Sequence, residues 1–579
     1  MRIHLHQTHH TLADFDAIQA TLAKTFQQPG VHLYPELFLT GYPLADLCLQ
    51  VPFVDAYEAF LSRLGTWLEG LPPSDNRVAL VGALSYERGT DGVPVRIRNV
   101  ALELVPGRLP REVYTKRLLP NYDIFDEQKY FTPGQAPGVW EWQDKRFALL
   151  ICEDMWASSF HDLDPCADLV ERGPFDAVFN LSASPWDVQK PAKRVQRARV
   201  LSHTLQAPFF YVNRVGGEDE ILFDGRSFLV DGEAPARLLS AFAEADETFE
   251  LPEGGPYAPP VNKLRDHTWE SLFAPRFSEN QSLPRQLHRW SDDECAQVHQ
   301  ALVFGLREYA RKNGFRRYLV ALSGGMDSAL VLAIVKAALG PEDAAEAVYM
   351  PSIHSAPLSW DLAIDICERL RVPLRSLPIK FLHANTKMAF QTTFPDAFGG
   401  LTDENVQSRL RGLLLYTRSN QTGAMVVNTS NKSELAVGYS TQYGDSVGAL
   451  SLLGDLYKCE VYRLAEWINA TFGPLIPEGI ITRAPSAELR EGQRDQDSLP
   501  PYERLDAMLE GILTYRMGHA GLVAMGFAPD EVDRVLKLYG GSEYKRRQFC
   551  PIIKIKPKSF GFGYRIPLTK HRGFYHPRS

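Results

Sequence analysis

Short apolar runs separated by stretches of helical periodicity fill the first half of the chain. The runs are rich in β-branched and aromatic residues and have the length of buried strands; they lie at 31–34, 78–84, 99–104, 147–152, 177–181 and 209–212. Apolar positions recur with helical spacing at 13–26, 53–68 and 192–205. This alternation predicts a layered α/β domain over residues 1–250.

The periodicity stops at 251–284, where Pro, Gly, Asn and Ser are dense, and we expect a connecting segment over 251–290. It restarts at Ser291, a helix N-cap candidate that is followed by amphipathic spacing through Lys312. Strand, helix and strand patterns then follow at 347–350, 358–370 and 425–428. This order predicts a second α/β domain over 291–579, with a doubly wound parallel sheet that binds its ligand at the carboxyl ends of the strands.

Composition narrows the class of protein. With 579 residues, 45% hydrophobic and 23% charged, the chain is too long for one core and has ordinary globular composition. A net charge of −8 argues against nucleic-acid binding, although the basic residues 545–547 fit either a solvated face or an anion site. Seven cysteines without a CxxC pair argue against zinc and disulfides and favour a reducing cytoplasm. Because no secretion signal or long apolar stretch is found, we expect no membrane association.

A glycine loop joins a predicted strand to a predicted helix in the second half. The apolar run 319–322 is followed by SGGMDS at 323–328 and by an almost wholly apolar helical segment at 329–338. The N-terminus of such a helix offers unpaired N–H groups and a positive dipole end to a phosphate. Ser323 and Ser328 add hydroxyl donors, and the carboxylate of Asp327 can hold Mg²⁺. The pattern predicts a pyrophosphate-binding loop.

This loop differs from a Walker A loop, which carries a Lys before its final Ser or Thr. It resembles instead the loop of the ATP pyrophosphatases, which cleave ATP to AMP and pyrophosphate. A bare SGG would more often be a glycine-rich turn without a ligand. The complete six-residue run between a strand and a helix favours the phosphate loop.

A second set of reactive residues lies in the first half. Cys152 follows the apolar run at 147–151, a position where a cysteine is more often a small buried hydrophobe than a nucleophile. Glu36 and Lys116 also follow strand candidates. A carboxylate can take the thiol proton, and an ammonium can lower the thiol pKa and stabilise an oxyanion. These three residue types are the parts of an amidase triad, but no sequence rule places them together in space.

The segments that carry both sets of residues resemble the glutamine-dependent NAD⁺ synthetases. In the first half these are YPELFLTGYP, KRLLPNYDIFDE, ICEDMW and YVNRVGGEDE, and in the second LSGGMDS, DENVQSRLRG, NTSNKSELAVGYSTQYGD and SEYKRRQ. The resemblance extends from Met1 to about Lys570. Three features depart from the family pattern. Met326 replaces a branched residue, Arg214 replaces a Gln that is common in the VNQVGG segment, and the tail after Cys550 diverges.

The resemblance implies a fold and a reaction. It implies an N-terminal nitrilase-like α-β-β-α sandwich that hydrolyses L-glutamine to glutamate and ammonia. It also implies a C-terminal ATP-pyrophosphatase domain that uses ATP and Mg²⁺ to adenylate nicotinic acid adenine dinucleotide (deamido-NAD). Ammonia would then displace AMP to give NAD⁺. Because ammonia is mostly protonated at neutral pH, we expect a protected passage for it, and the resemblance implies a homo-oligomer with paired synthetase domains.

The same resemblance assigns roles to individual residues. It implies Cys152 as nucleophile, Glu36 as base and Lys116 as electrostatic partner; Tyr42, Glu127 and Ser184 as glutamine contacts; Ser323, Gly324, Gly325, Asp327, Ser328 and Thr429 for ATP; Arg409, Asp445 and Lys458 for deamido-NAD; and Asp327 and Glu434 as Mg²⁺ ligands.

Other functions remain as alternatives. Another glutamine amidotransferase of the ATP-pyrophosphatase class would carry a different glutaminase. A nitrilase with an unrelated appended domain would not need SGGMDS. A non-enzymatic nucleotide sensor would be expected to lack Cys152 or Asp327, and both are present.

Overall fold

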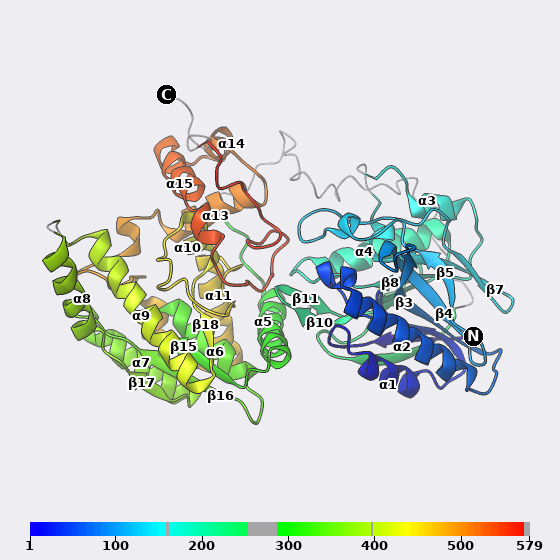
Figure 1. Cartoon of the computed structure of the whole chain (residues 1–579). Helices are drawn as coiled ribbons and strands as arrows, with labels where there is room; N and C mark the ends of the chain where they lie inside the picture. Colours follow the sequence, from blue (N-terminus) through cyan, green and yellow to red (C-terminus); the bar gives the residue numbers. More distant parts are fainter. Residues whose placement is uncertain (158–160, 253–285, 395, 397, 572–579) are drawn as a thin grey trace. The chain divides into compact units, whose positions relative to one another are not determined.

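The computed structural model describes residues 1–157, 161–252, 286–394, 396 and 398–571 (Figure 1). The chain divides into two compact units, Met1–Pro275 and Arg276–Ser579. Most of the connecting segment expected at 251–290 lies outside the described residues.

The first unit contains two six-stranded sheets. The first sheet has the order β14 (Ala245–Glu250), β1 (Arg2–Gln7), β2 (Gly30–Leu33), β3 (Arg77–Arg88), β4 (Pro94–Leu104) and β5 (Arg111–Thr115). The second has the order β13 (Arg237–Leu238), β12 (Phe228–Val230), β9 (Phe209–Asn213), β8 (Ala177–Ser182), β7 (Lys145–Ile151) and β6 (Val139–Trp142). In both, the central strands are parallel and the outer pairs antiparallel.

The two sheets pack face to face, and helices cover their outer faces. On β7, Phe147 and Leu149 join the core between the sheets, whereas Ala148 and Leu150 pack under α3 (Pro165–Val170) and α4 (Lys190–Leu205). The outer face of the first sheet packs against α1 (Phe15–Thr25) and α2 (Val51–Glu69). Strands buried on both faces read as continuous apolar runs. The result is the α-β-β-α sandwich that the family resemblance implied.

The second unit is built on a five-stranded parallel sheet with the order β17 (Leu374–Ser376), β16 (Ala344–Tyr349), β15 (Arg317–Ala321), β18 (Met425–Asn428) and β19 (Leu450–Ser451). The chain runs from β15 outward to β17 and then returns to β18 on the other side of β15. The strand order therefore reverses between β15 and β18, which is where doubly wound sheets bind ligands. The predicted doubly wound sheet is confirmed.

Helices surround this sheet (Figure 1). Those from the sheet region are α5 (Asp292–Lys312), α6 (Met326–Ala338), α7 (Pro357–Leu370), α8 (Lys380–Thr393), α9 (Leu401–Thr422), α10 (Lys432–Val437), α11 (Lys458–Phe472) and α12 (Glu478–Thr482). The C-terminal part adds α13 (Tyr502–Leu513), α14 (His519–Ala524), α15 (Pro529–Gly541) and α16 (Glu543–Arg546). The apolar helix α6 begins three residues earlier than predicted, so that Asp327 and Ser328 belong to its first turn.

Three imidazole rings stack on two neighbouring strands of the first sheet of the first unit, next to its edge strand β14. His4 and His6 lie on β1 and His32 on β2, and the ring centroids of His4 and His32 are 4.2 Å apart. His6 Nδ1 lies 2.6 Å from Asp246 Oδ1, His6 Nε2 lies 2.8 Å from His32 Nδ1, and His32 Nε2 lies 2.8 Å from the carbonyl oxygen of Gln28. These contacts tie β14 to β1 and β2.

The C-terminal tail is anchored beside α11. Asp455 is fully buried; its Oδ2 accepts hydrogen bonds from the backbone N–H groups of Ile555 (2.8 Å) and Lys556 (2.7 Å). Its Oδ1 accepts from Lys432 Nζ at 2.7 Å, and the same ammonium donates to the Lys558 carbonyl at 2.6 Å. The divergent tail is thus an integral part of the second unit.

Two general expectations can be compared with these elements. None of the seven cysteines, all of which are described, forms a disulfide bond. In the described part of the chain, no helix combines the length and the apolar character needed to cross a membrane.

We expect the Lys432→Met variant to destabilise the second unit by about 3–5 kcal/mol, because it leaves the buried Asp455 carboxylate without its counter-ion. The matched control is Arg316→Met, whose partner Glu342 is exposed, with an expected cost of about 0–1 kcal/mol. Hydrogen-exchange mass spectrometry of α11 amides measures both. Equal protection in the two variants would contradict the prediction.

Candidate active sites

Cys152 lies at the carboxyl end of β7, at the start of a short 3₁₀ turn (Cys152–Trp156). Its φ of 44° is in the left-handed region, which non-glycine residues adopt at a cost. The backbone N–H of Cys152 donates to Asn180 Oδ1 at 3.0 Å, and this bond helps to hold the turn. The side chain is buried. A strained, anchored cysteine at the end of a strand is typical of a nucleophile rather than of core packing.

Glu36 and Lys116 lie after β2 and β5, and the structure brings them together. Lys116 Nζ donates to Glu36 Oε1 at 2.6 Å and to Glu127 Oε1 at 2.9 Å. Glu36 also accepts from Asn99 Nδ2 at 2.8 Å and from the backbone N–H of Ala183 at 2.9 Å. All of these groups are buried, so the single positive charge of Lys116 balances the charges of two carboxylates in a site without solvent contact.

The charges around the thiol oppose one another. Burial raises the pKa of Cys152 well above its usual value, Glu36 raises it further, and Lys116 opposes both. Burial lowers the pKa of Lys116, but Glu127 and Glu36 outweigh this and keep the pKa well above its usual value. Transfer of the thiol proton to Glu36 leaves the net charge of this buried cluster unchanged. The arrangement therefore allows the Cys152 thiol to give its proton to Glu36 and become a thiolate while it stays buried.

Asp154 connects the segment of Lys116 to the turn of Cys152. Its Oδ1 accepts from the backbone N–H groups of Arg117 (3.0 Å) and Leu118 (2.8 Å). Its Oδ2 accepts from the N–H of Ile151 (3.0 Å) and from Tyr114 Oη (2.8 Å). Sequence analysis missed this role, although Asp154 stands in the ICEDMW segment.

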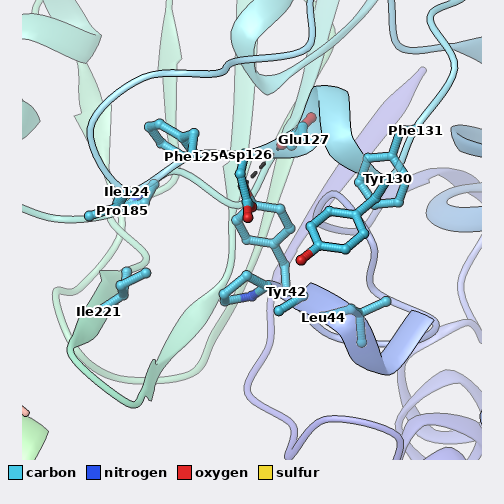
Figure 2. Close-up of a pocket in the computed structure, with 12 residues that line it drawn as sticks. Tyr42, Leu44, Ile124, Phe125, Asp126, Glu127, Tyr130, Phe131, Pro185 and Ile221 are labelled. Carbon is cyan, nitrogen blue, oxygen red and sulfur yellow. Dashed lines mark hydrogen bonds between the residues drawn. The ribbon is translucent and has the colours of Figure 1, made fainter. Parts of the chain in front are cut away.

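The residues predicted to contact glutamine lie on two sides of the same cluster. Tyr42 Oη donates to Glu127 Oε1 at 3.0 Å. Ser184 follows Ala183; its N–H donates to Asn213 Oδ1 at 2.8 Å, and its hydroxyl accepts from Arg194 Nε at 3.2 Å. Tyr42 and Glu127 line a cavity of about 30 Å³, which Cys152 does not line (Figure 2). A space of this size holds about one or two water molecules, which is less than the volume of an amino acid.

The phosphate loop lies between β15 and α6, as predicted. Gly324 has a φ of +79°, and a Cβ there would lie 2.3 Å from the Ser359 carbonyl oxygen, so only glycine fits. Ser323 Oγ accepts from the N–H of Gly325 at 3.2 Å and lies 3.1 Å from Ser328 Oγ. These bonds shape the loop before any ligand arrives.

Asp327 and Glu434 share the ammonium of Lys458. Lys458 Nζ donates to Asp327 Oδ2 and lies 3.5 Å from Glu434 Oε1, and Asn431 Nδ2 donates to Asp327 Oδ1 at 3.0 Å. Burial raises the pKa of Glu434, and Lys458 opposes this shift. The three side chains come from α6, α10 and α11. A second buried ammonium is thus held between two carboxylates.

A cavity of about 470 Å³ opens above the phosphate loop. Its lining includes every residue predicted for the second site, namely Ser323, Gly324, Gly325, Asp327, Ser328, Thr429, Glu434, Arg409, Asp445 and Lys458. Within it, Asp445 Oδ1 accepts from the N–H of Thr441 (2.7 Å) and from Ser408 Oγ (3.0 Å), so Asp445 also orders its own loop. Arg409 is exposed and donates to the Gln442 carbonyl at 3.3 Å. The volume is suited to a nucleotide-sized ligand.

Arg483 and Glu488 also line this cavity and were not predicted from the sequence, whereas Lys545 belongs to the basic stretch for which an anion site was one of two expectations. Arg483 donates to Ser359 Oγ at 2.7 Å and pairs with Glu488, but neither residue stands in a recognisable motif. Lys545 lines the cavity and donates to the Gly438 carbonyl at 2.8 Å, and burial lowers its pKa. The basic stretch 545–547 is therefore not simply a solvated face.

We expect the Lys116→Met variant to alkylate at Cys152 with iodoacetamide at least about 10-fold more slowly than the parent at pH 7.5. The reason is that Lys116 lowers the pKa of this thiol, and one pKa unit is a tenfold change in thiolate. The control is Lys129→Met, which removes an exposed ammonium bound to Asp46. Peptide mass spectrometry identifies the modified cysteine, and circular dichroism checks the fold. Unchanged alkylation in Lys116→Met would refute the electrostatic role.

This chain is similar to known proteins over nearly its whole length. A model of the NAD synthase family matches residues 298–549. The glutamine-dependent NAD(+) synthetase of Xanthomonas campestris is 37% identical over 94% of this chain and 91% of its own length. That of Thermotoga maritima is 32% identical, with 98% of each chain covered. The solved glutamine-dependent NAD⁺ synthetase of Acinetobacter baumannii, in complex with ADP, has 30% identity and a TM-score of 0.69 with 98% of each chain covered.

Proposed function

The chain belongs to the glutamine-dependent NAD⁺ synthetases, and from this we propose what each of its two sites does. The protein is a ligase that hydrolyses L-glutamine to glutamate and ammonia and uses ATP to convert deamido-NAD to NAD⁺, with release of AMP and pyrophosphate. The observation that carries the assignment of residues is the convergence of Glu36 and Lys116 beside the strained Cys152 turn.

In the glutaminase site Cys152 Sγ attacks the side-chain amide carbon of glutamine while Glu36 takes the thiol proton. The ammonium of Lys116 stabilises the oxyanion of the tetrahedral intermediate. Collapse of the intermediate breaks the C–N bond, and the proton held by Glu36 goes to the leaving nitrogen, which departs as ammonia. Glu36 then takes a proton from water, which hydrolyses the thioester to glutamate and restores the thiol. The 2.6 Å contact between Lys116 and Glu36 supports these roles.

Tyr42, Glu127 and Ser184 form the glutamine-binding walls of this site in our proposal. Tyr42 and Glu127 are joined by a hydrogen bond and line the small cavity (Figure 2). Ser184 is fixed by Arg194 next to the Ala183 N–H that binds Glu36. Glu127 binds Lys116 directly, and Ser184 is the next residue after Ala183, whose N–H binds Glu36.

In the synthetase site the carboxylate of deamido-NAD attacks the α-phosphorus of ATP and pyrophosphate leaves. Ammonia then attacks the activated carbonyl, and AMP leaves. We assign ATP binding to Ser323, Gly324, Gly325, Asp327, Ser328 and Thr429, and deamido-NAD binding to Arg409, Asp445 and Lys458. Lys458, the buried cation beside the phosphate loop, stabilises negative charge on the reacting phosphate.

Asp327 and Glu434 are the residues that would hold Mg²⁺. The donor set fits, because two carboxylates converge beside a phosphate loop and Mg²⁺ prefers one or two carboxylates together with phosphate oxygens. The ion would neutralise charge on the ATP phosphates.

We also propose that the protein is cytoplasmic and that its two domains span residues 1–250 and 291–579. The lack of disulfide bonds among the seven described cysteines agrees with a reducing compartment.

We further propose a homo-oligomer in which the synthetase domains pair. Helices α8 and α9 expose large apolar side chains, at Phe381, Met388, Phe390, Leu401 and Leu413. Exposed apolar side chains at this density favour contact with another protein surface.

The Cys152→Ala variant should lose glutamine hydrolysis and glutamine-dependent NAD⁺ formation and keep NAD⁺ formation from ammonium salts. The nucleophile serves only the first site, and the synthetase accepts ammonia as such. Cys48→Ala, which removes another buried thiol of the first unit, is the control and should keep both activities. If ammonium fails to rescue a folded Cys152→Ala protein, the two-site assignment is wrong.

The Asp327→Ala variant should show the opposite pattern. We expect glutamine- and ammonia-dependent NAD⁺ formation to fall at least about 100-fold, since loss of about 3 kcal/mol of charge stabilisation has this effect. Glutaminase activity should persist. Asp361→Ala, at an exposed position of α7, is the control. A near-parental rate of NAD⁺ formation in Asp327→Ala would remove this residue from the site.

A further inference from the structure

Arg214 is a buried cation that the reaction proposed above does not use. It stands between β9 and β10 (Val215–Glu218), where the family resemblance expects a glutamine. Its side chain is 6% exposed. Burial of a guanidinium is costly unless its charge and its N–H groups are satisfied, so the contacts of Arg214 indicate what it does.

The two ends of the guanidinium bind different parts of the first unit. Nη1 donates to the backbone carbonyl of Tyr42, and Nη2 donates to Glu218 Oε1 at 2.8 Å and to the His10 carbonyl at 3.4 Å. The guanidinium carbon Cζ lies over the ring of Phe223, 4.8 Å from its centroid. Phe223 belongs to β11 (Ile221–Asp224), which pairs with β10. Arg214 therefore joins the Tyr42 loop to the β10–β11 hairpin.

A glutamine cannot make this set of contacts. Its amide has two N–H groups on one nitrogen and carries no charge, whereas the guanidinium has five N–H groups in a planar fork. Only the fork can reach the Tyr42 carbonyl and Glu218 together. Glu218, itself buried, provides the compensating negative charge, so the pair forms one unit.

The contact with Tyr42 leads directly to the catalytic cluster. The phenol of Tyr42 donates to Glu127, and Glu127 accepts from Lys116. The Tyr42 ring also packs edge-on against Phe223, with the ring centroids 6.1 Å apart. With its carbonyl held by Arg214 and its ring held by Phe223, Tyr42 has little freedom to move its hydroxyl away from Glu127.

We propose that Arg214, paired with Glu218, is a positioning residue of the glutaminase site that acts through Tyr42 to fix the Glu127 carboxylate against Lys116. The proposal rests on the glutaminase function assigned above. Arg214 makes no contact with the thiol, so its effect passes through the Tyr42 peptide and hydroxyl.

The effect has a predictable direction. Burial raises the pKa of Glu127, and the hydrogen bonds from Lys116 and Tyr42 lower it. When Arg214 is replaced, Tyr42 donates less often, and the pKa of Glu127 rises further. A larger fraction of Glu127 is then protonated at a given pH, and this neutral form holds Lys116 less firmly. The acid limb of the glutaminase pH profile should therefore move to higher pH.

The test compares Arg214→Gln, Tyr42→Phe and the double variant of both. We expect Arg214→Gln to lower glutaminase kcat about 10-fold near pH 7, the change that a rise of one unit in the pKa of Glu127 would cause. The acid limb of the pH profile should move to higher pH. Tyr42→Phe should move the limb in the same direction, and the double variant should be no worse than Tyr42→Phe alone, because both changes break one pathway. Ammonia-dependent NAD⁺ formation should be unchanged in Arg214→Gln.

Two further variants separate positioning from folding. Arg214→Gln leaves Glu218 buried without its partner, so Arg214→Gln/Glu218→Gln is measured in parallel and should show the same shift of the pH profile. Arg214→Lys keeps the charge without the fork and should restore the thermal stability but not the parental profile. An unshifted acid limb in folded variants, or additive losses in the Tyr42→Phe background, would overturn the proposal. Absence of glutaminase activity in the parent would instead contradict the proposed function.

Discussion

One buried ammonium held between two carboxylates is the interaction on which the first site depends. Lys116 is fully buried and bound to both Glu36 and Glu127, so its position cannot change without exposing an unpaired charge. The sandwich supplies the rigid frame that this requires, because Glu36, Lys116 and Cys152 each follow a strand of one of two sheets packed face to face. The second unit repeats the scheme on an unrelated fold, with Lys458 between Asp327 and Glu434. In both units a buried ammonium group is in place that can stabilise a developing negative charge without any rearrangement of water.

The surrounding polar side chains serve mainly to orient this machinery. Asp154 accepts hydrogen bonds from three backbone N–H groups of two segments and from Tyr114 Oη, and Asn180 accepts from the backbone N–H of Cys152. In the second unit Asn431 orients Asp327. Asp and Asn have short side chains with few rotatable bonds. They can therefore hold a backbone segment or a carboxylate in place with little loss of side-chain entropy.

Much of the fold could be predicted from sequence, because buried strands such as β7 and β8 are apolar on both faces and leave an unmistakable local pattern. The phosphate loop was equally local, as its glycine and serine requirements arise within six residues. What could not be predicted depends on distant partners. The links made by Asp154 and Arg214 join segments from different parts of the chain, and helix α8 buries only His383 within the described chain, so no amphipathic core stripe reveals it. Arg214 was visible only as a departure from a family pattern.

The line of contacts from Asp246 through His6 and His32 to the Gln28 carbonyl has a consequence in proton number. Both ends of the line are acceptors, so its three hydrogen bonds need three protons on nitrogen, whereas two neutral imidazoles carry only two. Burial lowers the pKa of His32 to about 2, so this ring is neutral and donates in only one of its two contacts, while the bond to His6 lowers the pKa of Asp246. The tautomer of His32 therefore decides whether this ring donates to the Gln28 carbonyl or to His6.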